Sequence, residues 1–347
     1  MKKLFLTLDY ELYGNGSGDV FKHIIEPTEL ILAVCNKCDV KITIFFEVVE
    51  YWMLKKEWEK GNSMGYTKNP VTAMENQIRK TYQQGHDIQL HIHPQWVNAI
   101  YENGKWNVDF NAWRLGGYNG EDDKSLYHLL KRGKETLENI INHPSYQCTV
   151  LRAGGYNIQP SREVLNAMRE VGLWIDSSVY PGGKETGSLS QYDYSRITND
   201  KGYWYIDQDV LIDEKRKTPL VELPIVAFPM MRIEKFLTIE RIKSIFKNRQ
   251  SAKDSFDAKT SKGGVLAKII FFFQQEWQTW DYCLFSNRMH RKYIKKCNIL
   301  FRQKNRDCFV VIGHPKSLVT TKPLVFLLNQ AKHHEYIFQT IQQVEHL

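Results

Sequence analysis

Long hydrophobic runs are missing from this sequence. The most apolar stretch, GGVLAKIIFFFQQEW, is interrupted by Lys268, Gln274 and Glu276, so it is too short to cross a bilayer. At the N-terminus, MKKLFLTLDYELYG begins with two lysines, but Asp9 and Glu11 end the apolar segment early. No cleavage site of small residues follows, so a signal peptide is not indicated. The sequence therefore predicts a cytoplasmic protein.

Cysteine is also scarce. The six cysteines are scattered, at positions 35, 38, 148, 283, 297 and 308. Cys35 and Cys38 form the motif CNKC, and the sequence has no second CxxC that would complete a structural zinc site. We therefore expect two reduced cysteines at a helix end. The sequence also lacks internal repeats, and no helix signal follows its glycine-rich stretch GNGSG, which argues against a nucleotide-binding phosphate loop.

Acidic residues are few in one part of the chain. Residues 232–306 hold 18 Lys and Arg against 6 Asp and Glu, a surplus of 12, whereas the whole chain carries +8. The remainder is therefore about four charges negative (8 minus 12). We expect a single domain over 1–347 with a basic helical insertion at 232–306, broken by the polar stretch NRQSAKDSFDAKTSKGG. Two interpretations stay open, a solvated helical face or contact with an anionic glycan or membrane surface; no specific nucleic acid is expected, and no oligomeric state is indicated.

Strand patterns and helix patterns alternate over most of the chain. KKLFLTLDYE, KITIFFEVV, GHDIQLHIH and DCFVVIGHP are typical of strands. Between the first three lie two segments with helical signals, EPTELILAVCNKC and NPVTAMENQIRKTYQQG. A polar and aromatic stretch, YENGKWNVDFNAWRLGGYNGEDD, is too long for an ordinary connection, so we expect it to be functional or disordered. The alternation predicts a parallel α/β fold, either a barrel or a doubly wound sheet.

Polar side chains mark the ends of four predicted strands. In a parallel barrel the carboxyl ends of the strands meet at one face, where active sites are built. Two histidines and a carboxylate can hold a divalent metal ion, a second carboxylate can act as a base, and another histidine can act as an acid. These are the parts needed for metal-assisted hydrolysis of an amide or ester. The residues, in chain order, are Asp9, Glu11, His91, His93, Arg152 and His314.

The same segments resemble the motifs of the NodB-type polysaccharide deacetylases, carbohydrate esterase family four. FLTLDYE is similar to the first motif, GHDIQLHIH to the second, and LRAGGYN to the arginine motif. GLWIDSSV is similar to the strand that follows it, and VVIGHP to the final motif. The motifs occur in the family's order from Leu6 to Pro315. The resemblance implies a distorted (β/α) barrel that removes an acetyl group from an N-acetylated sugar.

The resemblance also implies a role for each residue. Asp9 matches the catalytic base, Arg152 the arginine that orients it, and His314 the catalytic acid. Glu11, His91 and His93 stand for the ligands of a divalent metal, for which we expect zinc. Two departures leave an exchange of roles between Asp9 and Glu11 open. Tyr10 separates two acids that are adjacent in the family, and Gln95 stands where the family has its second histidine.

Substrate contacts are expected from aromatic side chains. Tyr156 lies near the family's oxyanion-hole tyrosine but is offset by one residue. Trp96 and Trp113 are expected to offer faces on which a sugar ring can stack. Two other functions stay open. The chain would be a catalytically silent binding or scaffold protein if it holds no metal, or a glycoside hydrolase if two carboxylates, with Glu222 as the extra candidate, flank the substrate.

Overall fold

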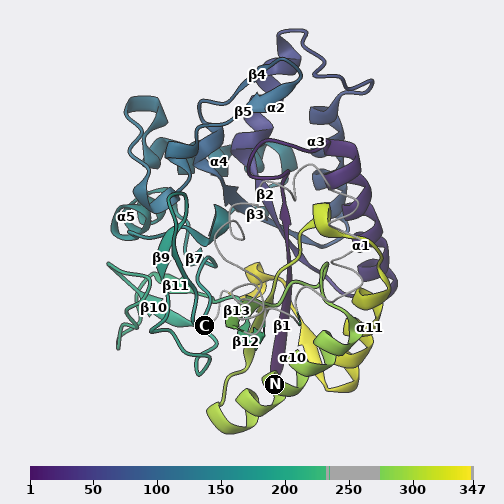
Figure 1. Cartoon of the computed structure of the whole chain (residues 1–347), viewed down its shortest axis with the longest axis vertical. Helices are drawn as coiled ribbons and strands as arrows, with labels where there is room; N and C mark the ends of the chain where they lie inside the picture. The colour runs from purple at the N-terminus through teal and green to yellow at the C-terminus, as the bar shows by residue number, and fades with distance from the viewer. Residues whose placement is uncertain (232–233, 235–273, 345–347) are drawn as a thin grey trace, which may run out of the picture.

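The structure is a computed structural model that describes residues 1–231, 234 and 274–344 (Figure 1). A nine-stranded sheet forms its centre. The order of eight strands is β10-β11-β7-β6-β3-β2-β1-β14, and β15 pairs with β1. The strands are β1 (Lys2–Tyr10), β2 (Thr43–Glu47), β3 (Asp87–Ile92), β6 (Val150–Ala153), β7 (Ile175–Asp176), β10 (Trp204–Ile206), β11 (Leu220–Glu222), β14 (Cys308–Val311) and β15 (Tyr336–Phe338).

All neighbours in this sheet are parallel except β10 and β11. The sheet curls until the chain beyond β11 reaches β14, where Ile225 forms an isolated parallel bridge with Val310. The backbone N–H of Val226 donates to the carbonyl of Val310 at 2.8 Å. This irregular seam joins the two ends of the sheet, and the expected distorted (β/α) barrel is confirmed.

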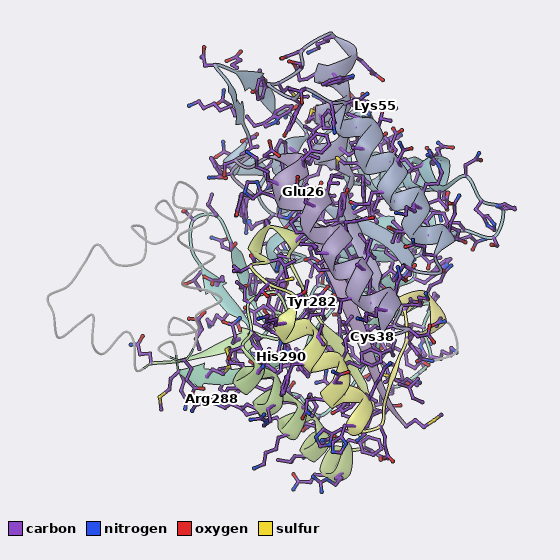
Figure 2. All side chains as sticks on the ribbon, turned by 90° about the vertical axis from the view of Figure 1, so that its right-hand side faces the viewer. Glu26, Cys38, Lys55, Tyr282, Arg288 and His290 are labelled. Carbon is purple, nitrogen blue, oxygen red and sulfur yellow. The ribbon has the colours of Figure 1, made fainter. Side chains whose placement is uncertain are left out.

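Helices cover the outside of the barrel, as the sequence patterns predicted. They are α1 (Glu26–Lys37), α2 (Val48–Glu59), α3 (Pro70–Gln83), α4 (Leu126–Ile141), α5 (Arg162–Val171), α10 (Asn287–Lys304) and α11 (Lys322–His333). The start of α3 shows the local cause: the Asn69 side chain accepts from the N–H groups of Val71 and Thr72, and Pro70 occupies the first turn. Figure 2 shows the face formed by α1, α11 and α10, which pack side by side. No helix of the described ranges is both long and apolar enough to span a bilayer.

The long aromatic stretch after β3 is ordered. It contains a hairpin of β4 (Ile100–Glu102) and β5 (Lys105–Asn107), followed by short 3₁₀ turns. Leu115 and Trp106 within it are buried and belong to the hydrophobic core of the barrel, so the stretch packs onto the rest of the protein.

Much of the basic segment lies outside the described residues, namely 232–233 and 235–273, including the polar stretch predicted within it. The described remainder contributes β13 (Gln275–Thr279) and α10. β13 pairs antiparallel with β12 (Ala227–Met231), and Met231 faces Gln275. The two described strands on either side of these residues therefore lie next to each other.

Candidate active site

The structure brings the six predicted residues together at one mouth of the barrel. Asp9 lies near the end of β1 and His91 near the end of β3, while Glu11 and His93 directly follow their strands. His314 lies three residues after the end of β14. In the sheet register His91 faces Arg152 of β6, so these positions lie at one level of the barrel. The cause is the one inferred from sequence, because carboxyl ends of parallel strands share an edge.

Glu11, His91 and His93 form the tightest cluster of this group. Glu11 Oε2 lies 3.2 Å from His91 Nε2 and 2.6 Å from His93 Nε2. All three side chains are buried, and their ligand atoms lie within 4.8 Å of one another. His91 Nδ1 lies 2.9 Å from the backbone carbonyl of Arg152, which can only accept a hydrogen bond. The proton of a neutral His91 is thus held on Nδ1, which leaves the lone pair of Nε2 directed toward Glu11.

The donor set fits a divalent metal ion such as zinc. Two imidazole nitrogens and one carboxylate oxygen are zinc ligands in catalytic sites. His93 adds a geometric indication, because its Nε2 lies 2.6 Å from Glu11 Oε2 but has no hydrogen-bond geometry toward any partner. His93 Nε2 and Glu11 Oε2 therefore lie close together without a hydrogen bond between them, as two ligands of one metal ion do.

Gln95 contacts this cluster without joining it. Its amide lies 2.9 Å from His93 Nδ1, and its Oε1 is buried with no partner. The nitrogen and oxygen of such an amide exchange places on rotation by 180°. With Oε1 toward His93, the amide accepts a hydrogen bond from the Nδ1–H group, and the lone pair of His93 Nε2 is left for the cluster. Gln95 therefore supports His93 from the position where the resembled family has its second histidine.

Gly154 is required beside His93. A Cβ built on Gly154 would lie 2.5 Å from the His93 ring, closer than real Cβ atoms approach other atoms. The glycine lets the chain after β6 cover the imidazole directly. Gly154 therefore lies directly against the His93 ring and restricts how the ring can be oriented.

Lys316 completes the cluster, and the sequence analysis did not identify it. Its Nζ donates to Glu11 Oε1 at 2.7 Å and to the carbonyl of Leu12 at 2.6 Å. Burial opposes ionisation of Glu11, but the positive charge of Lys316 and the contacts with His93 outweigh it and hold the Glu11 pKa well below its usual range. Lys316 thus occupies one carboxylate oxygen and leaves the other to the two histidines.

Asp9 and Arg152 form a buried ion pair at the side of the cluster. Arg152 Nη1 donates to Asp9 Oδ1 at 2.6 Å and to Thr7 Oγ1 at 2.8 Å. The same guanidinium donates to the carbonyl and the hydroxyl of Ser177, and it lies 3.9 Å from the ring centre of Phe45. Such a fully held arginine fixes the position of the carboxylate.

His314 faces Asp9 and is held from behind by Asp281. His314 Nε2 lies 3.8 Å from Asp9 Oδ2, and its Nδ1 lies 2.8 Å from Asp281 Oδ2. Burial lowers the pKa of His314, but the charge of Asp281 outweighs burial and raises it. The sequence analysis missed Asp281, because it lies inside the basic segment, in WDYC, where no strand pattern marks it as an active-site position.

The three predicted substrate-binding residues differ in position. Trp113 is half-buried, its ring centre lies 6.2 Å from that of His93, and its Nε1 donates to Ser190 Oγ. Tyr156 lies in the turn after β6 with φ +65°, and its hydroxyl is 3.4 Å from Thr279 Oγ1. Trp96 is only 1% exposed and packs against another tryptophan, so its predicted stacking on a sugar is wrong and it belongs to the core.

Glu222 does not line the opening of the site. It is fully buried in β11, where its register partner is Asp176 and its Oε1 accepts from the N–H of Val179. Burial and the nearby charge of Asp176 raise its pKa well above the usual range. A glycoside hydrolase needs two carboxylates that flank an accessible bond, so the position of Glu222 does not favour that alternative.

Comparisons with known proteins give structural matches only. No protein-family model and no curated protein match the sequence. Among solved structures, a Mycobacterium smegmatis protein described as a polysaccharide deacetylase is 13% identical, with a TM-score of 0.49 over 99% of this chain and 89% of that one. The catalytic domain of a peptidoglycan N-acetylglucosamine deacetylase from Eubacterium rectale is 11% identical, with a TM-score of 0.41 over 98% and 88%.

Other activities occur among the structural neighbours. Puue allantoinase is 13% identical, with a TM-score of 0.47 over 99% of this chain and 88% of that one. Polysaccharide deacetylases are thus among the neighbours, in line with the motif resemblance. A shared fold does not define an activity, so the function must be argued from the side chains of the site.

Proposed function

We propose that this protein is a metal-dependent hydrolase that removes the acetyl group from an N-acetylated amino sugar. The observation that carries the proposal is that Glu11, His91 and His93 converge at the barrel mouth where two pairs of opposite charge also lie. Asp9 is held by Arg152 on one side, and His314 is held by Asp281 on the other. The substrate would be a carbohydrate, and the metal ion zinc.

The geometry supports distinct roles for the two acids of the first motif. Glu11 offers an oxygen to both histidines, whereas one oxygen of Asp9 is taken by Arg152 and the other faces His314. This favours Glu11 as the metal ligand and Asp9 as the base. A zinc ion at the cluster would supply Lewis acidity toward the carbonyl of the acetamide.

The two proton transfers of the reaction are carried out by side chains of the protein. Asp9 takes a proton from the attacking water as the new carbon–oxygen bond forms. His314, protonated on both nitrogens, gives the proton of Nε2 to the amine nitrogen as the carbon–nitrogen bond breaks. Acetate and a free amine result. Arg152 holds Asp9 in position, and Asp281 accepts from Nδ1 of His314 and favours its charged form.

Acetate release tests this function. Protein stripped with a chelator and reloaded with zinc should release acetate from N-acetylated amino sugars, and the stripped protein should not. The measurement is enzymatic detection of acetate over a panel of mono- and oligosaccharides. Metal-loaded protein that holds about one ion per chain but releases no acetate would favour the scaffold alternative.

The alkaline limit of activity should depend on Asp281. His314 must be protonated to act, and the negative charge of Asp281 raises its pKa. In Asp281→Asn the pKa of His314 should fall, so activity should be lost at lower pH than in the wild type. The measurement is the pH dependence of kcat. Glu102→Gln, at an exposed position of β4, removes a charge of the same sign and is the control. An alkaline limit of kcat that does not move in Asp281→Asn would contradict the role of His314.

The basic segment is proposed as an insertion that contacts an anionic glycan or a membrane surface. β12 ends directly before this segment and pairs with β13, which lies inside it, so the pairing bears only on where the segment begins. Part of the basic surface of α10 is neutralised within the chain, since Lys292 pairs with Glu234 and Lys304 lies 3.7 Å from Asp200.

A further inference from the structure

A separate cavity opens beside the start of α5. Its volume is about 510 Å³, within the range of small-molecule sites. Two arginines, Arg114 and Arg162, line it together with the side-chain amides of Gln159, Gln191 and Gln208. No aromatic ring is among its lining residues, so it lacks the flat apolar face on which a neutral sugar stacks. Figure 1 shows α5 and β9 (Gln191–Asp193), which contribute to this wall, on the same side of the molecule.

The charge of the cavity is positive. Neither Arg114 nor Arg162 forms an ion pair with any acid among the described residues. Arg114 Nη1 donates to Gln191 Oε1 at 2.6 Å, which holds that guanidinium at the rim. Asp209 is the one acid among the lining residues, and its Oδ1 already accepts from the N–H of Leu211 at 2.9 Å. Two guanidinium groups against one carboxylate favour an anion.

The first turn of α5 adds to this preference. Ser161 precedes the helix, but its side chain does not cap it. Its Oγ instead accepts from the N–H of Val210 at 3.2 Å. The N–H groups of the first turn of this ten-residue helix are therefore without a side-chain cap, and such groups attract phosphate.

The cavity and the candidate active site share two loop segments. Arg114 directly follows Trp113, whose ring lies against His93. Gln191 directly follows Ser190, and Ser190 Oγ accepts from Trp113 Nε1 at 3.2 Å and from Asn157 Nδ2 at 3.1 Å. The loops that carry Arg114 and Gln191 are therefore continuous with Trp113 and Ser190 beside the candidate active site.

We infer that this cavity binds the pyrophosphate group of an activated sugar, and that the substrate is an N-acetylated sugar joined to pyrophosphate. Planar guanidinium groups recognise phosphoryl oxygens through paired hydrogen bonds. The acetamide would then lie at the metal cluster while the anionic group is held by Arg114 and Arg162. The substrate part of this inference rests on the proposed function, whereas the anion site itself does not.

Calorimetric titration with inorganic pyrophosphate tests the anion site directly. The full-length protein should bind it, and Arg114→Gln combined with Arg162→Gln should weaken binding by roughly tenfold or more per guanidinium. Arg216→Gln combined with Arg132→Gln removes the same charge from exposed positions outside the basic segment and should leave the affinity unchanged. Equal affinity in the wild type and the Arg114/Arg162 variant, or no binding to the wild type, would overturn the proposal.

Measuring acetate release shows whether the pyrophosphate belongs to a nucleotide-linked or a lipid-linked sugar. The same measurement tests the deacetylase function separately from the anion site. The substrates are a neutral N-acetylhexosamine oligomer, a nucleoside diphosphate N-acetylhexosamine, and a polyprenyl pyrophosphate carrying the same sugar. The Arg114/Arg162 variant should raise KM for one or both pyrophosphate substrates and leave kcat near the wild-type value. If pyrophosphate binds through the arginines but no substrate is deacetylated, the anion site stands and the proposed function fails. If only the neutral oligomer is deacetylated, with KM unchanged in the variant, the pyrophosphate substrate is overturned.

Discussion

Asp9→Asn should reduce kcat by about 10²–10⁴-fold, the usual contribution of a general base, while metal content stays at the wild-type level. The carboxamide keeps the size of the carboxylate but cannot take a proton from the attacking water. Glu11, His91 and His93 remain in place, so the metal cluster should be intact. Arg152 loses its charged partner at 2.6 Å, which also lowers stability, because an unpaired buried charge is costly.

Glu11→Gln is the matched variant, since it makes the same chemical change two residues away. It should lose metal as well as rate, because a neutral amide is a weaker ligand for zinc than a carboxylate. The measurement pairs acetate release with elemental analysis for both variants, and circular dichroism checks that each is folded. If Asp9→Asn drops the metal and Glu11→Gln keeps it, the roles of the two acids are reversed.

His91→Ala should remove the metal and with it all measurable deacetylation. The variant deletes one of the three clustered ligands, and the two that remain cannot hold zinc at the wild-type affinity. His93→Ala should have the same effect. His128→Ala, which changes an exposed histidine of α4, is the control and should retain about one ion per chain.

Metal content by elemental analysis after dialysis checks this expectation without any substrate. Retained metal in both His91→Ala and His93→Ala would exclude the cluster as the metal site. A second measurement, thermal unfolding with and without added zinc, should show stabilisation of the wild type by the metal and none for either variant.

Much of the candidate site was predictable from local patterns. The period of two in β3 places His91 and His93 on one side of the strand, and the same period in β1 places Asp9 and Glu11 together. Because these strands are parallel, their carboxyl ends meet at one mouth of the barrel. This can be inferred without knowing how the side chains pack. The fold class followed from the alternation of strand and helix patterns, and the structure confirms it.

Side-chain surroundings required the tertiary structure. Trp96 was expected to contact the substrate, yet packing against Trp106 buries it. Gln95 looked like the loss of a metal ligand, whereas in the fold it contacts His93 Nδ1. Whether a ring or an amide faces solvent depends on what the rest of the chain places over it, and a local pattern does not contain that information.

The sequence by itself determined the fold class and the ends of the strands where polar residues gather, because strand period and parallel order are local properties of the chain. Only the tertiary structure decided how these residues are held. Lys316 reaches Glu11 across 305 positions, and Asp281 reaches His314 across 33 positions. Such contacts depend on strand register and on the closure of the barrel, which place distant segments within 3 Å of each other and so set the charge and proton position of each group.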